Sequence, residues 1–152
     1  DPRAKNLKEL FDAYGSDKAS LHDYHRPYAS ITSNTPTGPI LEIGIGSTNT
    51  EIPANMGVSG VPGASLRAWR ALDAFEAVHG ADIDEETLVT SDGITSHLVD
   101  QTSQGSLARL AETLHRTHPG GLALIVDDGV HDQHANLLTL DTLVPALMAD
   151  GI

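Results

Sequence analysis

Short apolar segments recur at four places along this chain. Residues 40–43 are apolar apart from Glu42 and are predicted as the first strand, and residues 122–126 are a continuous apolar run, the pattern of a strand that is buried on both faces of a sheet. Residues 77–83 and 95–99 are predicted as two further strands. An acidic residue lies at or just after the end of each predicted strand. The carboxyl end of each predicted strand is therefore a candidate position for a functional polar residue.

Between these segments, apolar residues recur three and four positions apart, which is the spacing of amphipathic helices. The predicted helices cover residues 4–14, 64–72, 105–115 and 134–148. Residues 16–28 are polar and are expected to form a loop and a helix that runs to about Thr32. Residues 46–63 have no periodicity, and loops of this length are usually functional or disordered.

The order strand, helix, strand, loop, strand, helix, strand, helix predicts an α/β fold with a doubly wound, mainly parallel sheet. Ligands in such sheets bind outside the carboxyl ends of the strands. We expect residues 1–35 to form an N-terminal helical cap segment and residues 36–152 to form the domain that carries the sheet. Because residues 150–152 come where a fifth strand would begin, we expect this domain to be truncated before strand 5.

The amino-acid composition argues against several classes of protein and of functional site. The 152 residues carry a formal net charge of −12 with only 9 Lys and Arg, which argues against a nucleic-acid partner. No cysteine is present, so disulfides and thiolate sites are excluded. No apolar run approaches the roughly 20 residues that span a bilayer, so no membrane partner is expected. The charged N-terminus does not resemble a secretory signal, and we expect a cytoplasmic protein.

The first strand end combines one acid with two glycines. Glu42 lies within the strand, and Gly44 and Gly46 follow it, where backbone must turn tightly and approach a ligand. A nicotinamide-binding Rossmann fold would have a third glycine three residues later, where this chain has Asn49. We therefore discount a dinucleotide.

The next two strand ends also carry acids. Asp82 is favoured as a ligand of ribose hydroxyls, and Asp84 as the N-cap of a following helix. Asp100 and Gln101 end the third strand, at a position that suits an adenine amino group. A turn role is nearly as favoured for Asp100.

The fourth strand ends in two adjacent carboxylates, Asp127 and Asp128. Such a pair needs a compensating partner, and oxygen ligands suit Mg²⁺. His131 follows three residues after Asp128, and because histidine is the side chain that most often acts as a general base, it is a candidate base. The alternative is a solvated turn with a helix N-cap.

Taken together, these motifs resemble the class I S-adenosylmethionine-dependent methyltransferases, and most closely the bacterial sugar O-methyltransferases that tailor macrolides. The resemblance covers nearly the whole chain, at residues 15–24, 41–46, 62–69, 80–84, 99–102 and 127–131. The most specific parts are Gly-Ala-Ser-Leu-Arg-x-Trp at residues 63–69 and Asp-Asp-Gly-x-His at residues 127–131.

The resemblance implies a Rossmann-like methyltransferase fold with S-adenosylmethionine and Mg²⁺ as cofactors. Around the methionine part of the cofactor it places Glu42, Gly44 and Ser65, and it implies that Gly46 also binds the cofactor. It places Asp82 at the ribose and Asp100 with Gln101 at the adenine. It implies further that Asp127 and Asp128 bind the metal, that His131 is the general base, and that the segment with Lys18, His22 and Tyr24 folds over the site. A further metal ligand is expected beyond Ile152.

We therefore expect metal-assisted methyl transfer to a hydroxyl of a sugar or related small natural product, as in antibiotic biosynthesis. The acceptor would be a small molecule of glycoside type. Two alternatives stay open: a catalytically incomplete methyltransferase-like domain that binds the cofactor or acts as a scaffold, and a nucleotide-binding dehydrogenase. The identity of the acceptor and the oligomeric state, a homo-oligomer included, are also open.

Overall fold

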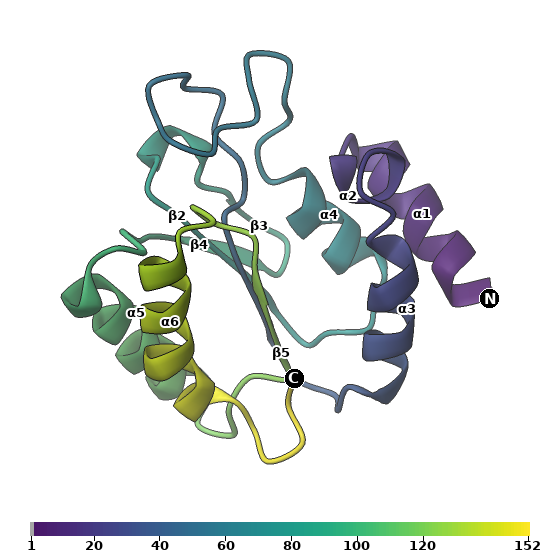
Figure 1. The fold of residues 1–152 in the computed structure, drawn as a ribbon. Helices are drawn as coiled ribbons and strands as arrows, with labels where there is room; N and C mark the ends of the chain where they lie inside the picture. Colours follow the sequence, from purple (N-terminus) through teal and green to yellow (C-terminus); the bar gives the residue numbers. More distant parts are fainter. Residues whose placement is uncertain (1) are drawn as a thin grey trace.

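The computed structural model describes residues 2–152, which form a sheet with helices on both faces (Figure 1). The α-helices are α1 (Pro2–Tyr14), α2 (Asp17–Ser20), α3 (His25–Asn34), α4 (Ala64–Ala71), α5 (Gln104–Thr117) and α6 (Gln133–Leu143). The strands are β1 (Ile40–Ile43), β2 (Val78–Asp82), β3 (Thr90–Ser91), β4 (Ile94–Leu98) and β5 (Leu124–Asp127). Two short 3₁₀ helices, η1 (Glu85–Thr87) and η2 (Val144–Ala146), complete the described part of the chain.

The strands lie in the order β3-β4-β2-β1-β5, and all pairs are parallel except β3 with β4. From β1 the chain moves outward to β2 and β4, and then returns to place β5 on the other side of β1. The strand order therefore reverses between β1 and β5. In a doubly wound sheet a ligand crevice opens at this reversal, beyond the carboxyl ends of the strands. The predicted fold class is confirmed.

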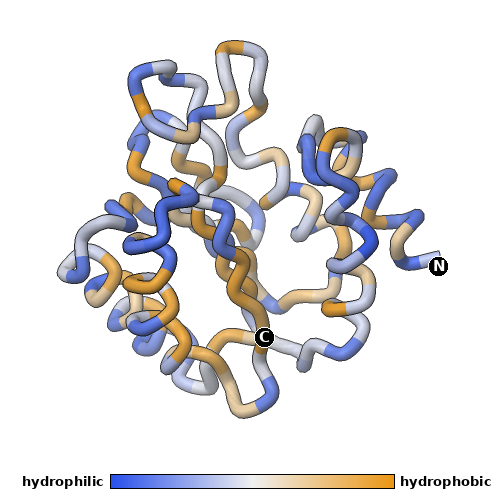
Figure 2. The backbone as a smooth tube through the Cα atoms, viewed as in Figure 1, coloured by the Kyte–Doolittle hydropathy of each residue, from blue (hydrophilic) through white to orange (hydrophobic). Residues whose placement is uncertain are grey.

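Two clusters of buried apolar residues join the helices to the sheet, and Figure 2 shows hydrophobic residues along its central strands. On one face, Leu66 and Trp69 of α4 pack against the strands, and Leu7 and Phe11 of α1 extend the same buried cluster, since α1 packs on α3 and α4. On the other face, α5 supplies a stripe of leucines that meets Leu41 and Ile43 of β1. Both faces of β1 are thus buried, which explains why its residues are apolar apart from Glu42. None of the helices formed by residues 2–152 has the length and apolar character needed to cross a membrane.

The structure departs from the sequence prediction at the end of α6 and at both edges of the sheet. The last helix ends at Leu143 rather than continuing to residue 148, because Pro145 has no N–H to extend the helical ladder. β3 was missed, since it has only two residues, both exposed. The outer edge of β5 is partly covered: the backbone N–H of Ile125 donates to Ile152, and that of Ile152 donates to Ala123.

Candidate functional site

A cavity of about 350 Å³ lies at the reversal of strand order. Its walls come from the segments that follow β1, β2, β4 and β5, from the loop before α4, and from the N-terminal segment around α2. Every predicted site residue lines it except Glu42 and Asp127: the lining includes Gly44, Gly46, Ser65, Asp82, Asp100, Gln101, Asp128 and His131. The fold thus brings residues from four strand ends to one hollow, as expected for parallel strands.

Gly44 allows the loops after β1 and β5 to approach each other closely. Its φ is +80°, and a Cβ there would lie 2.6 Å from the carbonyl carbon of Asp128 and 2.7 Å from the Cα of Gly129. Both are backbone atoms, which cannot rotate aside as the end of a flexible side chain can. The glycine is therefore required by this close approach as well as by its left-handed conformation.

Asp82, at the end of β2, forms hydrogen bonds that hold the same loop in place. One of its oxygens accepts a hydrogen bond from the backbone N–H of Ile45 at 2.9 Å, and the other accepts from that of Asp84 at 3.0 Å. Asp82 is only 9% exposed as a residue and lines the cavity. Asp84 accepts from the N–H of Glu86 as N-cap of η1, so its predicted capping role is confirmed.

Glu42 is fully buried beneath the cavity floor and does not line the cavity. Its carboxylate accepts hydrogen bonds from the hydroxyl of Ser65 at 2.6 Å and from the indole N–H of Trp69 at 2.5 Å. The predicted direct contact of Glu42 with a cofactor stays a prediction. In this structure Glu42 joins β1 to the first turns of α4.

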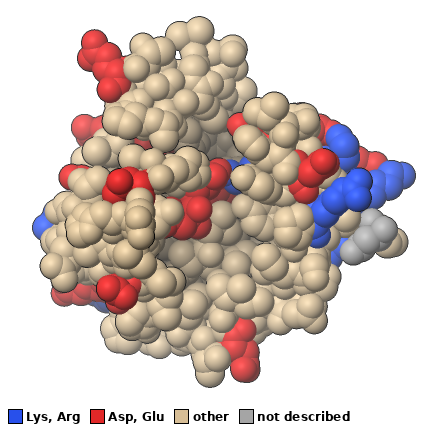
Figure 3. Space-filling view, viewed as in Figure 1, with Lys and Arg blue, Asp and Glu red and all other residues tan. Residues whose placement is uncertain are grey.

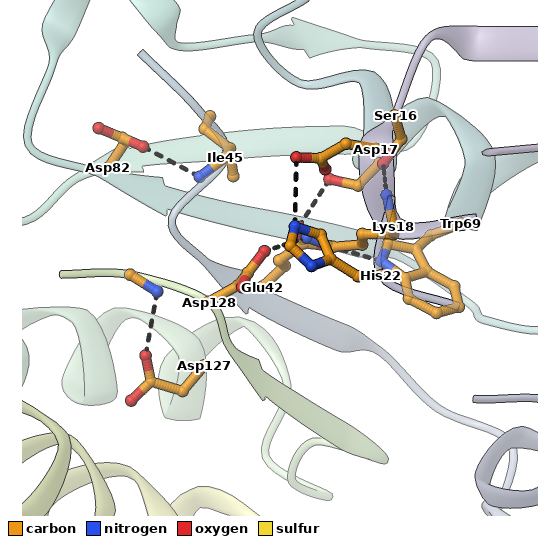
Figure 4. Close-up of polar contacts among 12 residues, drawn as sticks. Ser16, Asp17, Lys18, His22, Glu42, Ile45, Trp69, Asp82, Asp127 and Asp128 are labelled. Carbon is orange, nitrogen blue, oxygen red and sulfur yellow. Dashed lines mark hydrogen bonds and ion pairs between the residues drawn. The ribbon is translucent and has the colours of Figure 1, made fainter. Parts of the chain in front are cut away.

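Lys18 is the main site residue whose contacts the sequence did not indicate. This side chain of α2 is buried, and its ammonium nitrogen lies 3.2 Å from Glu42 and makes a short contact with Asp128 (Figure 4). Burial alone would lower the pKa of Lys18, but the two carboxylates outweigh this effect and raise it, so the ammonium stays charged. A pair 110 residues apart leaves no signal in local spacing.

Asp127, the last residue of β5, and Asp128, the next residue, point in different directions (Figure 4). Asp128 turns one oxygen to Lys18 and the other toward the Nε2 of His131 at 3.8 Å. Asp127 instead accepts from the side-chain amide of Gln101 at 2.8 and 2.9 Å. Of the two, only Asp128 lines the cavity, and the role of the pair as metal ligands stays a prediction.

The described residues fit a magnesium ion only in part. Asp128 faces the cavity, but one of its oxygens is bonded to an ammonium group and Asp127 is held elsewhere. Among residues 2–152, no three His, Asp or Glu side chains are placed so that they could hold a metal ion. This donor set does not make a complete site for a hard cation, which prefers six or more oxygen ligands.

Charge is distributed unevenly around the hollow. Acidic side chains gather at the hollow on the face shown in Figure 3, whereas basic side chains gather on the side of α1. The cavity carries the carboxylates of Asp17, Asp82, Asp100 and Asp128 on its walls, against the single ammonium of Lys18. A ligand with a positively charged group is therefore favoured over an anion.

Comparisons with known proteins give a match in structure but not in sequence. No protein-family model matches this chain, and no curated protein matches it. Among solved structures, it is similar to MycE methyltransferase from the mycinamycin biosynthetic pathway in complex with Mg and SAH, with a TM-score of 0.77 and 24% identity. That alignment covers 96% of this chain and 35% of the MycE chain.

Two further structures of the same enzyme agree. The complex with Mg, SAH and mycinamycin VI gives a TM-score of 0.77 at 24% identity, covering 96% of this chain and 37% of that one. A second crystal form with Mg and SAH gives 0.70 at 23% identity, covering 93% and 34%. The chain spans about a third of the length of these structures. Over nearly all of its own length, it has the Rossmann-like fold of a methyltransferase.

Proposed function

We propose that this chain is the cofactor-binding part of an enzyme that transfers a methyl group from S-adenosylmethionine to a hydroxyl of a small molecule. The observation that carries the proposal is the cavity at the reversal of strand order, lined by Gly44, Gly46 and Asp82. Solved structures of the same fold hold SAH, the product of that cofactor, and Mg. The acidic walls suit a cofactor that carries a sulfonium and an ammonium group.

The residues divide the cavity into three parts in this proposal. Gly44, Gly46 and Ser65 surround the methionine part, and Asp82 accepts hydrogen bonds from the ribose hydroxyls. Both oxygens of Asp82 already accept backbone N–H groups, which hold the carboxylate in place for this role. Asp100 and Gln101 lie at the adenine end. Because the Gln101 amide is bonded on both sides to protein groups, it shapes the wall there.

His131 is the proposed general base. Its ring is 66% exposed, lies on the cavity wall and stands 3.8 Å from Asp128. A neutral imidazole can accept the proton of an acceptor hydroxyl, and the Asp128 carboxylate then stabilises the imidazolium that forms. The cofactor supplies an already activated methyl group. The protein has to align the hydroxyl oxygen with it, which removes several kcal/mol of entropic barrier.

Mg²⁺ and a glycoside acceptor are finer parts of the same proposal. The support for both is that the MycE structures hold Mg, and one of them holds mycinamycin VI. Asp128 would be the ligand that this chain offers to the metal. Since the described donors are incomplete, no step above depends on it.

Calorimetry tests the cofactor. SAH and S-adenosylmethionine should bind the intact protein, NAD should not, and Asp82→Asn should weaken SAH at least tenfold, because a charged acceptor of hydrogen bonds is worth about 1.5–3 kcal/mol. Binding of NAD without SAH would refute the methyltransferase assignment. Transfer of labelled methyl to mycinamycin VI, as a probe acceptor, tests the reaction. Binding of SAH without transfer to this or other glycosides would favour a cofactor-binding scaffold.

A further inference from the structure

Lys18 links the N-terminal segment to the reaction site through two buried contacts. Its side chain is about 5% exposed, and its ammonium lies between the carboxylates of Glu42 on β1 and Asp128 after β5 (Figure 4). A buried ammonium is costly unless it is paired, so these contacts define where the side chain can lie. No step of the reaction proposed above uses this residue.

The same residue anchors the segment that covers the cavity. The backbone N–H of Tyr24 donates to the carbonyl of Lys18 at 2.7 Å, and the hydroxyl of Ser16 caps α2. On either side of Lys18, the side chains of Asp17, His22 and Tyr24 line the cavity. α2 has only four residues, too few to be stable alone. Its placement over the cavity therefore depends on contacts such as those of Lys18.

The contact with Lys18 also orients Asp128. A carboxylate is planar and rigid, so an ammonium bound to one oxygen determines where the other oxygen points. In this structure the other oxygen faces His131, whose backbone has a left-handed φ of +55°. Asp128 itself is 27% exposed, and without an anchor its carboxylate could rotate into the cavity.

We propose that Lys18 is a positioning residue of the methyl-transfer site: it holds the Asp128 carboxylate toward His131 and holds the segment of residues 16–24 over the cavity. This inference rests on the proposed function for its catalytic half. Its structural half, that Lys18 fixes α2 to β1 and to the residue after β5, does not depend on the reaction.

The test compares three variants of the intact protein with the wild type. Lys18→Met alone leaves the buried Glu42 charge unpaired and can unfold the chain, so Lys18→Met is combined with Glu42→Gln to remove both charges of that pair. Lys18→Arg keeps the positive charge. Lys5→Met is the matched control, because Lys5 is exposed on α1 and pairs with Glu9 at 3.7 Å on the same helix.

Two readouts separate positioning from stability. In the double variant we expect kcat for methyl transfer to mycinamycin VI to fall at least about tenfold, and by a larger factor than the affinity for SAH, which Glu42 can affect through Ser65. Lys18→Arg should recover part of the loss, and Lys5→Met should match the wild type. Amide hydrogen exchange should rise at least about tenfold over residues 17–24 in the double variant, with no change in α5.

Each result decides the inference. A kcat within twofold of the wild type, or a fall matched by an equal loss of SAH affinity, overturns the positioning role. If the wild type binds SAH but transfers no methyl group to any glycoside probe, the proposed reaction fails and the exchange experiment still stands. Unchanged amide hydrogen exchange over residues 17–24 in the double variant would then also overturn the proposal that Lys18 holds this segment in place.

Discussion

Three histidine side chains meet on the face of the sheet covered by α5. His79 of β2 lies between two others: its Nδ1 is 3.1 Å from the Nε2 of His97 on β4, and its Nε2 is 2.8 Å from the Nε2 of His118, just after α5. His79 is only 5% exposed. Burial, with smaller contributions from His97 and His118, lowers the pKa of His79 from 6.5 to about 4.

This pKa makes stability depend on pH in a definite direction. Below pH 6.5 the unfolded chain binds a proton at His79 that the folded chain does not bind, so the free energy of unfolding falls as the pH falls toward 4. For one such group, the loss between pH 7 and pH 5 is about 2 kcal/mol. Burial also lowers the pKa of His97, which acts in the same direction.

Urea unfolding at pH 7, 6 and 5 measures this loss, with the fluorescence of Trp69 as the probe. Trp69 is the only tryptophan of the chain and is fully buried, so its emission should change on unfolding. His79→Gln should flatten the pH dependence, and His115→Gln, at an exposed position of α5, should leave it as in the wild type. A wild-type loss below about 0.5 kcal/mol, or an unaltered slope in His79→Gln, would refute the reasoning.

Two further predictions concern the site itself. Replacing His131 by Ala, or Asp128 by Asn, should reduce methyl transfer at least about 100-fold, the usual contribution of a general base, while calorimetry finds SAH affinity nearly unchanged; near wild-type turnover in either variant would contradict the assigned roles. Gly44→Ala should lower the free energy of unfolding by more than about 2 kcal/mol in urea, because it adds a backbone clash to a left-handed strain of about 1–2 kcal/mol. Gly57→Ala is its control, since Gly57 has a φ of +73° and open space around it; equal losses in the two variants would remove the clash from the explanation.

Much of the fold follows from local sequence patterns. A strand that is buried on both faces must be apolar at every position, and residues 40–43 are an apolar run apart from Glu42. The turn after it needs residues that tolerate positive φ, and Gly44 and Gly46 both adopt it. Even the error at the end of α6 was readable, because Pro145 is a stronger local signal than a continuing stripe of leucines.

The sequence by itself therefore determined the α/β class, the order of the elements and the strand ends that border one cavity. Only the tertiary structure decided how the carboxylates at those ends are used. It buries Glu42 under the cavity, turns Asp127 to Gln101, and pairs Asp128 with Lys18 from the other end of the chain. The physical reason is that the two effects act over different separations along the sequence. Backbone periodicity acts over a few residues, whereas the partner of a buried charge is chosen by whichever donors folding brings within about 3 Å.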